Sequence, residues 1–215
     1  SHLKKLPSIR GEWNLNNTST LVPREWESYS SLEKLFHYPW LYVLDYKAAF
    51  SSESISSITN DFRVKGIFAH KIFEDYFTEY NTPDLMKGSD LMGWYESNFN
   101  RYVEQYAILW KHEGQETTLI SMKEQVGVAL EALRKHLIED NWTVLGMEHK
   151  LKDKIYGTGF TGYIDMALER GSEKCAVDLK YGGSKKYNGY LQENRDLQLS
   201  LYSKFYGEGS FAYTA

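Results

Sequence analysis

Residues 163–180 hold the feature that most constrains the fold, two alternating segments joined by Gly171 and Ser172. Glycine readily takes the positive φ that the first central position of a II′ turn needs, so this pair predicts a two-residue hairpin turn. The resulting register places Leu168 opposite Cys175, Met166 opposite Val177 and Ile164 opposite Leu179. One face of the hairpin is then apolar along its length, which supports the register independently.

The same register places Asp165 opposite Asp178 on the polar face. Facing side chains have β-carbons roughly 5 Å apart, and like charges there are destabilising. Two such carboxylates need a shared proton or a cation, and oxygen ligands suit Mg²⁺ or Mn²⁺. Lys180 points to the same side as Asp178, where its charge would assist a reaction beside a metal. The alternative is an exposed polar strand face whose lysines damp the repulsion.

The pattern of hydrophobic residues changes at Asn141, from helical spacing before it to strands after it. A helix is expected over 62–80, with His70 on its inward-facing stripe and Pro83 ending it. Further helices are expected over 89–112 and 117–139. The expected strands are 143–155, 160–170 and 173–180, followed by a lysine- and glycine-rich loop to Gly189 and a last helix over 191–206.

The N-terminal part is less regular. Residues 1–28 show little periodicity and predict an irregular arm, leaving 29–215 as one domain. Ser30–Glu33 has the spacing of a capping box at the start of an apolar run that extends to about Phe50. Pro39 lies inside that run and predicts a kink or two short helices. The serine-rich segment 51–60 predicts a loop or a helix cap.

Composition narrows the class of protein. Hydrophobic residues make up 42% and aromatic residues 15%, which excludes a disordered chain. No apolar run is long enough to span a bilayer, and no secretory signal is recognisable, so a cytoplasmic protein without a membrane partner is expected. Cys175 is the only cysteine, which excludes disulfides and cysteine-built metal sites within this chain.

Charge gives a weaker indication of a partner. The net charge of −4 argues against a broadly basic nucleic-acid clamp but is compatible with a carboxylate metal site. Lysines do gather locally, at Lys150, Lys152 and Lys154 and again at Lys180, Lys185 and Lys186. On the sequence alone, a solvated face is the simpler interpretation of that cluster.

The order of several motifs resembles the RecB/AddB-type branch of the PD-(D/E)XK nucleases, over about Ser30 to Tyr206. The matching segments are Ser30–Glu33 with Tyr38-Pro39-Trp40, Gly66–Glu74, Glu148, Gly162–Asp165, Val177–Lys180 with Gly182-Gly183, and Gln198–Tyr202. The resemblance implies an α/β, restriction-endonuclease-like core with a mixed central sheet flanked by helices. Residues 84–140 would be a helical insertion on that core.

The resemblance also implies roles for single residues. His70, Asp165 and Asp178 would bind Mg²⁺ or Mn²⁺, and Lys180 would be the catalytic lysine beside the two aspartates. Residues expected to support the site or contact DNA are Gln198, Tyr202, Glu148, Glu74, Lys185 and Lys186. Glu74, one helical turn after His70, would orient the imidazole.

The implied activity is metal-dependent cleavage of DNA by an exonuclease of repair or recombination, fused to or associated with a helicase. The chain departs from the branch at Tyr38, where iron–sulfur members have a cysteine, so no iron–sulfur cluster is expected. It also departs at Tyr163, where an arginine is usual. Two competing interpretations are a catalytically silent DNA-binding module and an iron oxygenase that uses His149 as a second histidine.

Overall fold

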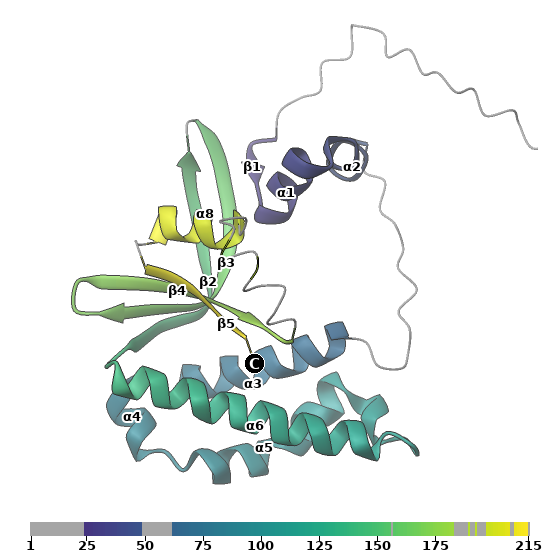
Figure 1. Ribbon diagram of the computed structural model, residues 1–215, viewed down its shortest axis with the longest axis vertical. Helices are drawn as coiled ribbons and strands as arrows, with labels where there is room; N and C mark the ends of the chain where they lie inside the picture. The colour runs from purple at the N-terminus through teal and green to yellow at the C-terminus, as the bar shows by residue number, and fades with distance from the viewer. Residues whose placement is uncertain are drawn as a thin grey trace, which may run out of the picture.

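The computed structural model describes residues 24–48, 62–155, 157–182, 189, 192, 197–206 and 209–214. In this part of the chain, five strands form one mixed sheet with helices on both sides (Figure 1). This arrangement confirms the predicted α/β class with a restriction-endonuclease-like core. Lys185, Lys186 and the serine-rich segment 51–60 lie outside the described residues.

A long antiparallel hairpin is the centre of the sheet. It consists of β2 (Thr143–Ile155) and β3 (Thr158–Arg170), and β4 (Glu173–Lys180) pairs with β3. These are the three strands that the sequence predicts. Two strands were not predicted, β1 (Trp26–Glu27), parallel to β3, and β5 (Gly209–Thr214), parallel to β4. The first is too short to show a period, and it lies in the segment expected to be irregular.

The turn between β3 and β4 is the predicted one. Arg170 pairs with Glu173, and Gly171 has a φ of 62°. The predicted pairs of Met166 with Val177 and Leu168 with Cys175 are also present. The ladder ends at Met166, however, so the expected pairs Ile164–Leu179 and Asp165–Asp178 do not form.

One layer of helices covers one side of the sheet (Figure 1). It contains α3 (Phe62–Glu79), α4 (Pro83–Gly88), α5 (Leu91–Tyr106), the short η2 (Ile108–Lys111) and α6 (Glu116–Glu139). The single helix expected over 89–112 is instead two helices, because Ala107 between them has a non-helical backbone with φ −143° and ψ 36°. Pro83 starts α4 as well as ending the preceding pattern, and the Thr82 side chain caps that helix.

The other side of the sheet carries α1 (Tyr29–His37), α2 (Pro39–Tyr42), η1 (Val43–Lys47) and α8 (Leu197–Tyr206) (Figure 1). The two short helices predicted around Pro39 are confirmed. The capping box lies two residues earlier than expected, because Ser28 and Ser31 exchange hydrogen bonds between side chain and backbone. None of the described helices is long and apolar enough to cross a membrane.

Two hydrophobic clusters hold these layers together. The larger one fills the space between the sheet and the helices α3 to α6, and includes Phe68, Ile72, Tyr76, Leu130 and Met166. The smaller one lies beneath α8 and includes Leu151, Phe160, Ile164, Ala176 and Tyr202. Strand β4 contributes Leu179 to the larger cluster and Ala176 to the smaller one, so both layers can place side chains beside it.

Replacing Gly159 with alanine should loosen the contact between β1 and the sheet. A β-carbon at this position would lie 2.3 Å from the Glu25 carbonyl oxygen and 2.7 Å from Cε3 of Trp26. Overpacking of this kind typically costs about 1–3 kcal/mol. Urea unfolding would measure the loss, with Gly88→Ala as the control because nothing lies within 4 Å of a β-carbon there. Equal stability of the two variants would contradict the close approach.

Candidate metal and catalytic site

Three potential metal ligands meet near the end of β4. His70 comes from α3, Glu148 from β2 and Asp165 from β3, and one ligand atom from each lies within 4.8 Å of the other two. The His70 Nε2 atom is 3.9 Å from Oδ2 of Asp165. A histidine nitrogen and two carboxylates converging from three elements form a donor set that fits a divalent cation.

A change in strand alternation brings the two carboxylates to this side. Met147 and Met166 pack into the larger cluster, toward α3. Their neighbours Glu148 and Asp165 face His70 on the same layer, so successive residues of each strand point the same way at this rung. Glu148 adopts a left-handed φ of 48°, a conformation that costs a non-glycine residue of order 1–3 kcal/mol. The sheet tolerates this strain at the position where the carboxylate joins the group.

Electrostatics at Glu148 favour a cation. Although the residue is exposed overall, desolvation of its carboxyl raises its pKa, and the nearby charges of Asp165 and Glu74 raise it further. His70 and Lys71 oppose that shift. A bound divalent ion would offset this repulsion at Glu148, because it supplies positive charge between the carboxylates.

The backbone of Leu179 connects both other members of the group to β4. Its N–H donates to Oδ2 of Asp165 at 2.7 Å, and its carbonyl oxygen lies 2.7 Å from Nε2 of His70. A carbonyl only accepts, so the His70 imidazole donates from Nε2 in this arrangement. Leu179 therefore binds both Asp165 of β3 and His70 of α3 through its backbone.

A second group adjoins the first on the side of α8. Lys180 Nζ lies 3.0 and 2.8 Å from the two carboxylate oxygens of Asp178, and donates to Gln198 Oε1 at 3.2 Å. Gln198 Nε2 in turn donates to Asp178 Oδ1 at 2.8 Å. Asp178 is only 1% exposed, so this carboxylate needs both partners. The predicted neighbours Asp178 and Lys180 share one side of β4.

Tyr202 is the last member of this second group. Its hydroxyl accepts from Gln198 at 3.0 Å and donates to the Tyr163 carbonyl at 2.5 Å. Burial raises the pKa of Tyr202 to about 12, and the charges of Asp178, Asp165 and Glu148 act in the same direction. The hydroxyl therefore stays protonated and orients the Gln198 amide.

The remaining predicted residues lie as follows. Glu74 pairs with Lys71, and no hydrogen bond joins it to His70 among the described residues. His149 packs its ring against Tyr206 of α8, with 5.5 Å between centroids, away from His70. The group of potential ligands found in the described part of the chain thus has one histidine, which does not suit the oxygenase interpretation.

The sequence did not identify Glu148 as a potential ligand. Met147 pairs with Met166 and His149 with Ile164, so Glu148 lies opposite Asp165. The same facing argument that was applied to β3 and β4 would have found it. That argument needs the register of β2, which the turn residues Gly157, Thr158 and Gly159 do not fix from the sequence alone; in the structure Ile155 pairs with Thr158, and this register continues past Glu148.

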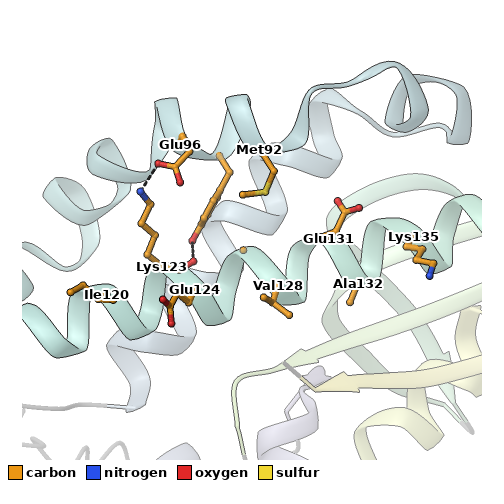
Figure 2. A pocket seen from close by; sticks show the side chains of 11 residues that line it. Met92, Glu96, Ile120, Lys123, Glu124, Val128, Glu131, Ala132 and Lys135 are labelled. Atoms are coloured by element: carbon orange, nitrogen blue, oxygen red, sulfur yellow. Dashed lines mark hydrogen bonds and ion pairs between the residues drawn. The ribbon is translucent and has the colours of Figure 1, made fainter.

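A separate groove of about 710 Å³ lies between α5 and α6 (Figure 2). Met92, Ile120 and Val128 contribute exposed apolar side chains to it, and the Lys123–Glu96 ion pair lies at its edge. None of the residues that line it belongs to either polar group described above. Figure 2 shows that its side chains come from the helical layer alone.

The sequence matches a known protein family. Residues 27–215 match the family model of the PD-(D/E)XK nuclease superfamily. This match covers most of the sequence, and the chain belongs to this superfamily. No curated protein matches it.

Tyr202→Phe should destabilise the protein and Tyr206→Phe should not. The first change removes a hydroxyl with two hydrogen-bond partners and leaves the Tyr163 carbonyl without its donor. A buried group left unsatisfied costs about 1–3 kcal/mol. The Tyr206 hydroxyl is buried with no partner among the described residues, so its loss should be neutral or stabilising. Chemical unfolding would measure both; equal effects would contradict the network.

Proposed function

We propose that this chain is a DNA nuclease that hydrolyses phosphodiester bonds with Mg²⁺ or Mn²⁺. The observation that carries the proposal is the group His70, Glu148 and Asp165 beside the Asp178–Lys180 pair. Membership of a nuclease superfamily supports the same chemistry. His70, Asp165 and Asp178 are the proposed metal ligands from the sequence, and the geometry adds Glu148 to them.

The residues around the ion have separable tasks. A bound Mg²⁺ or Mn²⁺ supplies an activated water and a positive charge for the phosphate. Asp165 reaches the ion site with its second oxygen already held by the Leu179 N–H, so little ordering remains when a ligand arrives. His70 is held against the Leu179 carbonyl in the same way. The three grouped ligands His70, Glu148 and Asp165 come from one helix and two strands, which fixes their spacing, whereas Asp178 on β4 lies outside that group and is held by Lys180 and Gln198.

Lys180 is the proposed catalytic residue. Its ammonium group is oriented by Asp178 and Gln198, and cannot itself bind a cation. A fixed positive charge stabilises the negative charge that develops on a phosphate during hydrolysis, because no reorganisation is needed at that moment. Gln198 and Tyr202 are positioning residues, since they hold this ammonium without reaching the phosphate.

The finer assignment rests on the order of motifs. We assign the chain to the RecB/AddB-type branch, as an exonuclease of DNA repair or recombination in the cytoplasm. A fused or associated helicase would supply the affinity for DNA that a chain of net charge −4 lacks. The alternative of a silent DNA-binding module is disfavoured, because Asp165, Asp178 and Lys180 are all present and hydrogen-bonded.

One assay tests the activity and its mode together. The purified protein is incubated with end-labelled linear DNA and with covalently closed circular DNA, in Mg²⁺, Mn²⁺ or EDTA. An exonuclease degrades the linear DNA alone, and only with metal. Cleavage of the circle would replace the exonuclease assignment with an endonuclease, and the absence of cleavage in both metals would overturn the proposal.

Lys180→Ala should separate catalysis from metal binding. The lysine is not a ligand, so Mn²⁺ affinity should persist while cleavage falls about 10²–10³-fold. Asp165→Ala should instead weaken both. Calorimetric Mn²⁺ titration also reports whether each variant is folded, which matters because Lys180 neutralises the buried Asp178. Lys174→Ala, an exposed change on the same strand, is the control. Wild-type cleavage by Lys180→Ala would show that the site has been misassigned.

Glu148→Gln tests the ligand that the structure adds. The change keeps the shape of the side chain but removes the negative charge that faces Asp165. Mn²⁺ should bind more weakly, because loss of one carboxylate ligand reduces the charge of the donor set. Glu74→Gln is the matched control, since Glu74 pairs with Lys71 instead of entering the group. Equal Mn²⁺ affinities of the two variants would remove Glu148 from the ligand set.

A further inference from the structure

A row of lysines leads away from the candidate metal site along β2. Lys150, Lys152 and Lys154 follow Glu148 at alternate positions, so they share its face of the strand, and all three are exposed. The residues opposite them on β3 are Tyr163, Thr161 and Gly159. Figure 1 shows this part of the β2–β3 hairpin extending away from the helices α3 to α6. We call this face of the hairpin the lysine row.

The lysine row gathers three positive charges on one strand face. Within the described residues, none of its three ammonium groups lies in an ion pair, and Lys152 lies instead over the Trp26 ring at 4.2 Å from the centroid. Six lysines elsewhere are paired with acids: Lys34, Lys71, Lys111, Lys123, Lys135 and Lys180. Asp153 is the one acid within the row's sequence, and alternation places it on the opposite face of the strand.

Tyr163 adds an aromatic ring near the candidate metal ligands Glu148 and Asp165. It is 51% exposed, pairs with Lys150, and lies two residues before Asp165 on the same face of β3. Its backbone carbonyl is held by the Tyr202 hydroxyl, so the position of the residue is fixed while its ring remains open to solvent. An exposed ring on a positive strip, beside a site for phosphate chemistry, is a candidate surface for base stacking.

The spacing of the row suits an extended polyanion. Alternate residues of a strand are about 6.8 Å apart, so the three lysines span roughly 14 Å in a line that starts beside Glu148. Proteins that bind single-stranded nucleic acid combine such a positive track with aromatic rings that stack on unpaired bases. A duplex would offer phosphates to the lysines, but its bases are already stacked and would not use Tyr163.

We propose that the lysine row binds the backbone of single-stranded DNA and leads it to the metal site, with Tyr163 stacking on the base nearest to the cleaved bond. This inference rests on the proposed nuclease function and names its substrate class. The lysines supply salt-sensitive affinity that does not depend on sequence, whereas Tyr163 supplies the preference for unpaired DNA. Together they give a chain of net charge −4 a local surface for a polyanion.

The test measures binding without cleavage. A fluorescein-labelled thymidine 30-mer and its duplex with the complementary adenine strand are titrated in EDTA at several salt concentrations. The first variant is Lys150→Gln with Lys152→Gln and Lys154→Gln. Its control is Lys87→Gln with Lys111→Gln and Lys135→Gln, which removes the same charge from the helical layer. The second variant is Tyr163→Ala, with Tyr163→Phe as its rescue.

The row variant should bind the single strand more weakly, and the slope of log affinity against log salt should fall by about 2, since each phosphate contact contributes about 0.7 for single strands. The control should keep the wild-type slope. Tyr163→Ala should weaken single-strand binding about 5- to 150-fold and leave duplex binding unchanged, while Tyr163→Phe retains wild-type affinity.

Two outcomes would overturn the inference. One is a wild-type salt slope in the row variant, and the other is equal wild-type affinity for the single strand and the duplex. Mn²⁺ titration and cleavage are measured on the same samples, so failure of the nuclease proposal is recognised separately. If the row variant binds and cleaves DNA like the wild type, the nuclease proposal stands and only the proposed role of the lysine row is refuted.

Discussion

The backbone of one residue, Leu179, holds the candidate site together. Its N–H binds Asp165 and its carbonyl binds His70, so a single peptide segment fixes a strand and a helix that are distant in sequence. Backbone groups at a strand end are normally satisfied by a neighbouring strand, but the β3–β4 ladder stops at Met166. The site therefore lies where the pairing of β4 with β3 ends, while β4 stays paired with β5 through Lys180, and polar side chains take the place of the missing β3–β4 ladder.

The same break explains the arrangement of the acids. Asp178 and Lys180 turn toward α8, where Gln198 satisfies them, and Leu179 turns into the larger cluster. Asp165 and Glu148 face α3 because the alternation of β2 and β3 changes at the strained Glu148. Strain in a non-glycine residue persists only where surrounding contacts determine it. Here the long β2–β3 ladder on both sides of Glu148 supplies those contacts.

Sequence reasoning predicted what depends on local pattern. The hairpin turn at Gly171, the three central strands, α3 and α6 follow from turn chemistry and periodicity, which act over a few residues. The expected Asp165–Asp178 pair failed because regular alternation was extended past the end of the ladder. Neither β1 nor β5 was predicted, since each is defined by a partner far along the chain. The motif resemblance supplied the residue roles, which pattern alone could not.

The distribution of charge on the surface, more than the net charge, would decide where such a chain binds DNA. A site that concentrates carboxylates for a metal repels phosphate until the cation is present, so the affinity for the backbone has to come from beside it. Several described lysines, such as Lys111, Lys123 and Lys135, form ion pairs with neighbouring acids, whereas the three lysines of the row on β2 have no acid partner among the described residues. Because that row begins two residues after Glu148, the proposed surface for the DNA backbone and the proposed site of its cleavage lie on one strand face, and the strand sets the distance between them.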